Sequence, residues 1–205
     1  WLAALACLGA FAVLSQSRGA ILALVITVVI APLWFRDRHS RVFSILAVIA
    51  TGAAFYVMYD LIAKRGSSYR PEIFHAVVDM IAAHPWTGLG LGAGYDVSAV
   101  GKHFDHTHNM FTHVAVEMGL PGMLLWVTVW LYTLGEIVRA RATLFGKVLL
   151  CFWVYSTLAM QFDAASLTGT PRAEWFISWL PVGLAMMLPW GRAENDACGK
   201  ISGST

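Results

Sequence analysis

The sequence predicts an all-α membrane protein whose helices cross the bilayer several times. Hydrophobic residues make up 58% of its 205 residues and charged residues only 13%, whereas soluble domains carry roughly 45–50% apolar and about 25% charged residues. The mean hydropathy is +0.65, and the apolar residues gather in runs close to the roughly 20 residues that a membrane-spanning helix needs. This composition excludes an ordinary soluble enzyme and a disordered chain. A net charge of only +2 provides no basic field for a nucleic-acid partner.

We expect about six transmembrane helices, the first of them truncated. The chain opens on an apolar run, but it has no initiator Met and lacks the basic n-region and the small-residue cleavage site of a signal peptide. We therefore interpret residues 1–14 as the remainder of a longer helix, and the chain as the C-terminal portion of a larger protein. The five complete helices are expected at residues 19–35, 42–59, 110–134, 144–162 and 173–190.

The positions of lysine and arginine predict which segments face the cytoplasm, because short cytoplasmic loops are enriched in these residues. Three alternating segments carry them: Arg36, Arg38 and Arg41, then Arg139, Arg141 and Lys147, then Arg192 and Lys200. The chain is thereby divided into transmembrane helices at 1–59, a long outer loop at 60–109, transmembrane helices at 110–190 and a polar cytoplasmic tail at 191–205. We expect this tail to be disordered.

The outer loop is expected to contain a helix that lies in the membrane interface. Residues 67–72, Ser-Ser-Tyr-Arg-Pro-Glu, have the capping serines, early proline and first-turn acid of a helix start. Apolar residues then recur at helical spacing as far as His84-Pro85, and such an apolar face favours an interfacial position. The glycine-rich run at 88–94 follows no strand, so it does not predict a nucleotide-binding turn. We expect a flexible loop whose backbone can approach a ligand or a neighbouring helix.

Two arginines at the outer boundary are candidate ligands for phosphate. Arg70 begins the predicted helix, where free backbone N–H groups and the positive end of the dipole favour an anion. Arg18 lies between two apolar runs, at the boundary between membrane and water. Each has a simpler explanation: Arg70 as a surface residue paired with Glu72 or Asp79, and Arg18 as an anchor that extends to the interface.

The densest group of titratable residues follows the glycines: His103, Asp105, His106, His108 and His113. Histidine accepts a proton near neutral pH, so a general base is one interpretation. A metal site is a second, although no standard zinc spacing is present, and a set of exposed loop histidines is a third. Glu117 lies four residues after His113, so the two should share a helix face, either as a functional pair or as a hydrogen-bonded part of the bundle.

Four segments, taken in order, resemble the O-antigen ligase family. His108-Asn109, nine further residues and then Gly119-Leu-Pro-Gly122 resemble the family's signature, which is His followed by Asn, Ser or Gln, then nine residues, then Gly-x-x-Gly. The segment Arg18-Gly-Ala-Ile-Leu22 resembles its Arg-x-x-x-Leu motif. Residues 65–74 and 84–90 are similar to its outer-loop signatures. Each segment is short, and their agreement in order and predicted topology carries the resemblance.

The resemblance implies a multi-pass glycosyltransferase of the bacterial inner membrane, surrounded by membrane lipids, with its active site on the periplasmic face. The long outer loop would then be periplasmic. Such proteins transfer a finished glycan from undecaprenyl pyrophosphate to an acceptor, which for an O-antigen ligase is a sugar hydroxyl of lipid A-core. O-antigen or exopolysaccharide polymerases and O-linked oligosaccharyltransferases share the donor and stay open as alternatives.

The residues and the resemblance together predict one mechanism. Arg18 and Arg70 would bind the pyrophosphate, because charge-assisted bonds from arginine suit phosphate oxygens. His108 would accept the proton of the attacking hydroxyl. The reaction would be a direct displacement with inversion, with neither a metal nor another cofactor. Asn109, His106 and Arg65 are secondary candidates for the site.

A membrane transporter or channel is the alternative from a different class. It would use the arginines, Glu117 and the histidines as a path for an ion or substrate. This alternative accounts for the apolar helices. It gives no purpose to an outer segment of roughly 50 residues, and loops of that length are usually functional or disordered.

Overall fold

The computed structural model describes residues 18–65, 69–162, 167 and 174–188, and these are mostly helical. The helices are α2 (Arg18–Ile30), α3 (Pro32–Phe35), α4 (Arg38–Arg65), α5 (Arg70–Ala83), α6 (Met110–Arg139), α7 (Leu144–Ala159) and α8 (Glu174–Met186). Two short strands, β1 (Val97–Ala99) and β2 (Lys102–Phe104), separate α5 from α6 in the sequence. The truncated helix expected at 1–14 and the tail expected at 191–205 lie outside the described residues.

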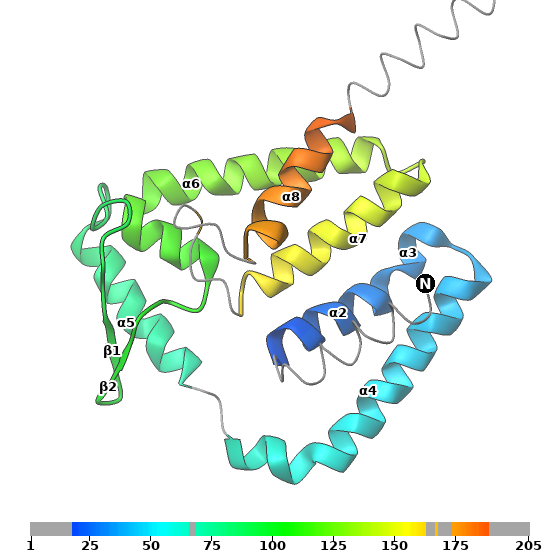
Figure 1. Ribbon diagram of the computed structural model, residues 1–205, viewed down its shortest axis with the longest axis horizontal. Coiled ribbons are helices and arrows are strands. Elements are labelled where there is room, and N and C mark those ends of the chain that lie inside the picture. Colours follow the sequence, from blue (N-terminus) through cyan, green and yellow to red (C-terminus); the bar gives the residue numbers. More distant parts are fainter. Residues whose placement is uncertain (1–17, 66–68, 163–166, 168–173, 189–205) are drawn as a thin grey trace, which may run out of the picture.

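The larger helices pack side by side (Figure 1). α2 contacts α4 on one side and α7 on the other, and α6, α7 and α8 contact one another. α5 and the two strands lie at one end of this body, where α5 packs on α6. The segment between α5 and α6, which contains the candidate histidines, is therefore held against the beginning of α6.

Two helical stretches are long and apolar enough to cross a membrane. They are Arg18–Phe35, with a mean hydropathy of 2.1, and Met110–Arg139, with a mean hydropathy of 1.6. The helices expected at 42–59, 144–162 and 173–190 overlap α4, α7 and α8. α4 presents large apolar side chains to the outside, among them Phe43, Ile45 and Ile49. The structure thus agrees with a helical membrane protein, and the number of six crossings stays a prediction.

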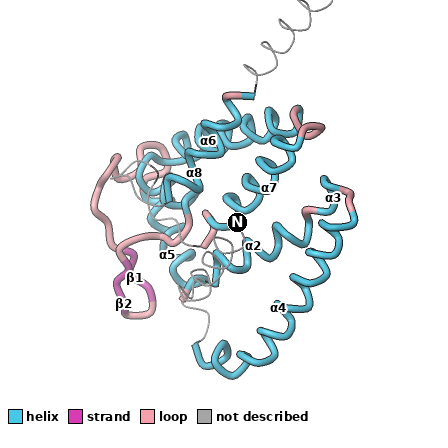
Figure 2. Tube along the Cα trace, turned by 45° about the vertical axis from the view of Figure 1, so that its right-hand side comes forward, coloured by secondary structure: helices cyan, strands magenta, loops and turns pink. Residues whose placement is uncertain are grey.

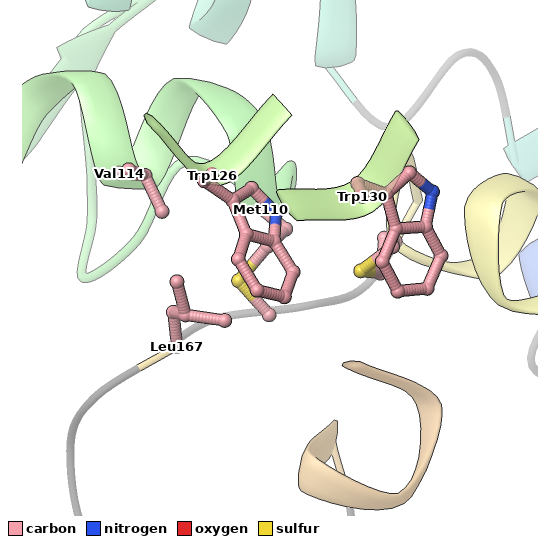
Figure 3. Close-up of a cluster of buried hydrophobic side chains, with 6 residues drawn as sticks. Met110, Val114, Trp126, Trp130 and Leu167 are labelled. Atoms are coloured by element: carbon pink, nitrogen blue, oxygen red, sulfur yellow. The ribbon is translucent and has the colours of Figure 1, made fainter. Parts of the chain in front are cut away.

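A cluster rich in tryptophan holds α6 against its neighbours. Met110, Val114, Trp126 and Trp130 are buried together with Leu167 (Figure 3). Trp130 stacks on Trp153 of α7 with ring centroids 5.5 Å apart, and Trp126 meets Trp179 of α8 edge-on at 5.2 Å. Such aromatic pairs contribute about 0.5–1.5 kcal/mol each beyond their buried area. The cluster fixes the beginning of α6, and so the residues just before it, against α7.

α6 bends at Gly119, where φ is 68° and ψ is −175°. Two residues later Pro121 has no N–H with which to bond the carbonyl of Glu117. The bend therefore leaves the carbonyls of Val116 and Glu117 and the N–H of Leu120 without their helical partners. Buried backbone groups of this kind need other hydrogen bonds.

The loop after α5 supplies all three missing partners. The bonds are Leu89 N–H to Val116 O at 2.8 Å, Gly90 N–H to Glu117 O at 3.0 Å, and Leu120 N–H to Pro85 O at 2.8 Å. The backbones approach so closely that a Cβ at Gly88 would lie 2.5 Å from Glu117 O, and one at Gly119 would lie 2.7 Å from Trp86 O. The glycine-rich run thus lets the backbone approach a neighbouring helix, one of its two expected uses. We call this set of three bonds the backbone clasp.

The strands β1 and β2 form an antiparallel hairpin that the sequence analysis did not predict (Figure 2). Val100 and Gly101 connect them with φ angles of 52° and 68°, as in the turn type that suits two-residue hairpins. Val97 and Ala99 are buried with residues of α5. α5 itself begins at Arg70 and ends at Ala83, in agreement with the predicted helix start and with the predicted end at His84-Pro85.

Candidate functional site

The C-terminal end of α7 is the place where the first turns of three other helices meet. Gly19, in the first turn of α2, packs directly on the side chain of Phe162. Arg70, the first residue of α5, donates a hydrogen bond to the backbone carbonyl of Phe162. Met110, the first residue of α6, donates its N–H to Met160 O at 2.9 Å. The N-termini of α5 and α6 and the first described residues of α2 therefore gather at the C-terminal end of α7. The positive ends of α5 and α6 face the negative end of α7 there, and Arg70 adds a formal positive charge that favours an anion.

Arg70 extends from α5 to the end of α7. Besides its bond to the carbonyl, its Cζ lies 5.6 Å from the centroid of the Phe162 ring. Neither Glu72 nor Asp79 forms an ion pair with it among the described side chains. A guanidinium has five N–H donors, and among the described residues Phe162 is the one acceptor bonded to Arg70. The first turn of α5 also lacks a capping bond from the side chain of Tyr69.

Arg18 begins α2 next to the same phenylalanine. Its side chain is exposed, and the residue that follows it, Gly19, is in contact with Phe162. The two predicted phosphate ligands, which are far apart in sequence, therefore come to one end of the bundle. Arg18 adjoins Phe162 through its neighbour, whereas Arg70 bonds it directly.

Asn109 caps α6 and connects it to α7. Its side-chain oxygen accepts from the N–H groups of Phe111 at 2.9 Å and Thr112 at 3.2 Å. Its side-chain nitrogen donates to Gln161 Oε1 at 2.7 Å. An asparagine cap of this kind stabilises a helix by about 1 kcal/mol. The bond to Gln161 holds the beginning of α6 against the end of α7, next to Phe162, which accepts a hydrogen bond from Arg70.

His108 is held in a left-handed backbone conformation, with φ of 57°. Its two neighbours are both tied down, because Thr107 Oγ1 donates to Asn109 O at 2.8 Å and Asn109 caps the helix. Such a conformation in a residue other than glycine costs about 1–3 kcal/mol and persists only where its surroundings enforce it. The half-buried His108 ring thus lies just before α6, whose first residue, Met110, bonds Met160 at the end of α7.

His106 and Asp105 accompany His108. The His106 and His108 rings lie with centroids 3.9 Å apart, and His106 Nδ1 is 2.6 Å from Asp105 Oδ1. This hydrogen bond and the charge of His106 lower the pKa of the Asp105 carboxyl. Asp105 therefore stays a carboxylate at neutral pH and is able to orient the His106 ring.

A second polar group lies deeper, between the loop and α6. The Tyr95 hydroxyl is 2.6 Å from His113 Nδ1, and His113 Nε2 is 3.5 Å from Glu117 Oε2. His113 and Glu117 are buried, with exposed fractions of 5% and 6%. The prediction that these two residues share a helix face is confirmed.

The remaining candidates are placed elsewhere or lie outside what is described. The exposed His103 faces Ser98, 3.1 Å away, and Asp96 on the outside of the hairpin. Arg65 is the last residue of α4, and its side chain is not among those described. Among the described side chains, no three of the His, Cys, Asp and Glu type are arranged to hold a metal ion.

Three residues of this region were not predicted from the sequence: Tyr95, Gln161 and Phe162. Phe162 contributes a backbone carbonyl and a ring face, which no residue pattern reveals. Gln161 lies at the end of a predicted helix, and Tyr95 follows the glycines as a single aromatic residue. Only the fold brings them to residues that are more than 15 positions away, at Arg70, Asn109 and His113.

The arrangement has the parts of a site for displacing an anionic leaving group. Arginines and helix N-termini are able to hold a negative charge, and they stabilise it most as it develops. A histidine such as His108 is able to remove a proton from an attacking hydroxyl.

Comparison with known proteins gives the chain's relatives. A family model described as O-antigen ligase matches residues 3–127. A curated O-antigen ligase of Pseudomonas aeruginosa is 28% identical over 158 residues, which cover 74% of this chain and 38% of that relative. The chain thus spans well under half the length of the relative it matches. No solved structure matches it. The match to the family model includes Arg18, Arg70 and His108.

Proposed function

Because the chain belongs to the O-antigen ligase family, we propose that it transfers O-antigen polysaccharide from undecaprenyl pyrophosphate to a sugar hydroxyl of lipid A-core. The observation that carries this proposal is that Arg70, the residue after Arg18 and the start of α6, which follows His108, all contact residues 160–162 at the end of α7. Family membership favours a glycosyltransferase over a transporter. The apolar helices support a place in the inner membrane, with the site at the periplasmic face.

The donor's pyrophosphate binds between Arg18 and Arg70. Its lipid tail lies in the bilayer, so its charge lies at the depth of the interface, where we place both arginines. Arg70 has a neutral carbonyl as its acceptor at Phe162. A phosphate oxygen is a stronger acceptor for guanidinium, since charge-assisted bonds are roughly twice as strong as neutral ones.

His108 is the general base of the transfer. Its imidazole takes the proton of the acceptor hydroxyl while that oxygen forms a bond to the anomeric carbon of the donor glycan. The bond from the anomeric carbon to pyrophosphate breaks at the same time, and undecaprenyl pyrophosphate leaves with the bonding electrons. Attack from the side opposite the leaving group inverts the anomeric centre. The negative charge grows on the pyrophosphate in the transition state, where the arginines stabilise it.

Three further residues support this machinery. Asn109 sets the position of His108 by capping α6 and bonding Gln161. His106, oriented by Asp105, lies against the His108 ring and assists its proton transfer. Arg65 precedes Arg70 by five residues and adds a cation to the same outer segment. No metal is needed, because the arginines supply the positive charge.

A lipopolysaccharide gel of a deletion strain tests this function. We expect loss of all glycan-capped lipopolysaccharide and accumulation of lipid-linked polymer. Both changes should be reversed when the protein is expressed again. A lipopolysaccharide capped by a single repeat unit would instead identify a polymerase. Unchanged capping would contradict both functions.

A further inference from the structure

Tyr69 stands where the local structure does not favour a tyrosine. It directly precedes α5 and has a left-handed backbone conformation, with φ of 57°. Such a conformation is unfavourable for a residue other than glycine and persists only where its surroundings enforce it. The Tyr69 side chain also provides no capping hydrogen bond for α5, although capping residues are preferred at this position. The stability of the helix start therefore does not account for this side chain.

Three other described residues besides glycine share this backbone conformation: Arg36, Val100 and His108. Arg36 follows the last residue of α3, and Val100 lies in the turn of the hairpin. A left-handed residue is common at both kinds of position. Tyr69 and His108 instead lie just before helices, where an extended backbone is usual. Because strained residues gather at binding and catalytic sites, we ask what connects these two.

Aromatic rings connect Tyr69 to His108. The ring centroid of Phe104 in β2 lies 6.4 Å from that of Tyr69 and 6.3 Å from that of His108. Both distances are within the range of aromatic pairs. Phe104 also packs against the buried residues Ile73 and Val77 of α5, beside which the hairpin lies (Figure 1). The hairpin thus fixes the Tyr69 and His108 rings relative to each other.

Lys102 holds the Tyr69 ring as well. It lies two residues before Phe104, so the two side chains share one face of β2. Lys102 Nζ lies 4.4 Å from the centroid of the Tyr69 ring and donates to its hydroxyl at 3.2 Å. Even with these contacts, Tyr69 is 39% exposed. A ring that is held in place and yet exposed is suited to binding, because a ligand that packs on it costs little conformational entropy.

The position of Tyr69 indicates which part of the donor it meets. The next residue is Arg70, the proposed pyrophosphate ligand, and two ring contacts lead from Tyr69 to His108, the proposed base. In the displacement described above, the first sugar of the glycan lies between the pyrophosphate and the base. A pyranose ring has a face of C–H groups, and aromatic rings pack well against such apolar surfaces.

We propose that Tyr69 is a substrate-binding residue whose ring packs against the first sugar of the lipid-linked donor, the sugar attached to the pyrophosphate. The proposal rests on the function proposed above. Phe104 and Lys102 act as positioning residues that hold the Tyr69 ring. Undecaprenyl pyrophosphate, the product that leaves, has no sugar for the ring to contact. Tyr69 therefore favours the loaded donor over the spent one.

The test is Tyr69→Leu in the full-length protein, measured as the binding of two ligands. These are undecaprenyl-pyrophosphate-linked glycan and undecaprenyl pyrophosphate alone. We expect the first to bind about 10-fold more weakly, as for the loss of one aromatic contact, and the second to change by less than about twofold. Tyr69→Phe keeps the ring and should retain most of the binding. Tyr132→Leu, at a tyrosine of α6 that is 65% exposed, is the matched control and should weaken neither ligand.

Tyr69→Gly separates binding from folding. Glycine adopts a φ of 57° without strain, so this variant should melt no lower than Tyr69→Leu. It removes the ring, and binding of the lipid-linked glycan should weaken to the same extent. Tyr69→Gly therefore also supplies the test if Tyr69→Leu fails to fold.

Unchanged binding of the lipid-linked glycan by Tyr69→Leu would overturn the proposal. Equal weakening of both ligands would overturn it too, because the ring would then act at the pyrophosphate or on the fold. A rise in KM confined to lipid A-core would assign the ring to the acceptor and so contradict the proposal. Failure of the wild-type protein to transfer the lipid-linked glycan would instead refute the proposed function itself.

Discussion

Arg70 bonds a backbone carbonyl of Phe162, and Arg18 is exposed beside the same residue. This position, more than charge alone, distinguishes them from the other arginines whose side chains the structure describes. Part of it was predictable: the motifs around Arg18 and Arg70 identify both residues. Their common neighbour was not predictable, because Phe162 lies 92 residues beyond Arg70 and offers only its carbonyl and ring.

Arg18→Ala and Arg70→Ala should each reduce glycan transfer by about 100-fold, the usual effect of removing one donor from a developing anion. Lysine should restore little, since it lacks the planar pair of donors. The measurement is capped lipopolysaccharide at matched protein levels. Arg141→Ala, a change at an exposed arginine of the turn between α6 and α7, should have no effect. Wild-type transfer by either site variant would remove that residue from the pyrophosphate site.

His108→Ala should abolish detectable transfer but leave binding of the lipid-linked donor nearly intact, because the arginines hold the pyrophosphate. General bases contribute about 10²–10⁴-fold. In the wild type, transfer should fall in acid, where the imidazole gains a proton and loses its role as a base. His103→Ala is the matched control, since His103 lies on the exposed side of the hairpin. Substantial transfer by His108→Ala would mean that the base lies elsewhere.

At the scale of elements, the positions of α5 and α6 were predictable from the sequence and the contacts between them were not. Ser67 to Glu72 and His84-Pro85 mark the two ends of α5 by local chemistry. The bend of α6 depends on three hydrogen bonds with a loop roughly 30 residues upstream, and Gly119 and Pro121 alone do not reveal them. The hairpin escaped prediction because its strands have only three residues each.

Gly119→Ala should loosen the backbone clasp. Gly119 has a φ of 68°, and a Cβ there would lie 2.7 Å from Trp86 O, so both strain and overlap oppose the change. We expect the free energy of unfolding to fall by about 1–3 kcal/mol, seen as a lower melting temperature in detergent. Gly135→Ala, in the same helix and with nothing near the new methyl group, should be neutral or stabilise by up to about 1 kcal/mol. Equal melting temperatures for the two variants would contradict this role of the clasp.

At the scale of the whole molecule, Arg18, Arg70 and Met110, which follows His108 by two residues, begin helices that contact the end of α7. Arg38 begins α4 and Arg141 follows α6, each next to a turn between helices. The alternation of charged loops predicts that these turns face the cytoplasm. The sequence therefore predicts both the class of fold and the side of the membrane. The gathering of α2, α5 and α6 at the end of α7 requires the tertiary structure, because it depends on how these helices pack.

Cysteine labelling tests this orientation. With Cys7, Cys151 and Cys198 changed to serine, His103→Cys should react with a membrane-impermeant maleimide from the periplasm. Arg141→Cys should react only after the inner membrane is opened. Both positions are exposed, so accessibility within the protein does not limit the reaction. Labelling of the two positions from the same side would contradict the proposed topology.

The most direct measurement is transfer by the full-length protein in vesicles that contain undecaprenyl-pyrophosphate-linked glycan and lipid A-core. The proposed mechanism predicts one molecule of undecaprenyl pyrophosphate released for each lipid A-core that gains a glycan, and neither product with His108→Ala. Movement of a small solute across the vesicle membrane, with no undecaprenyl pyrophosphate released from donor and acceptor, would contradict it and favour a transporter.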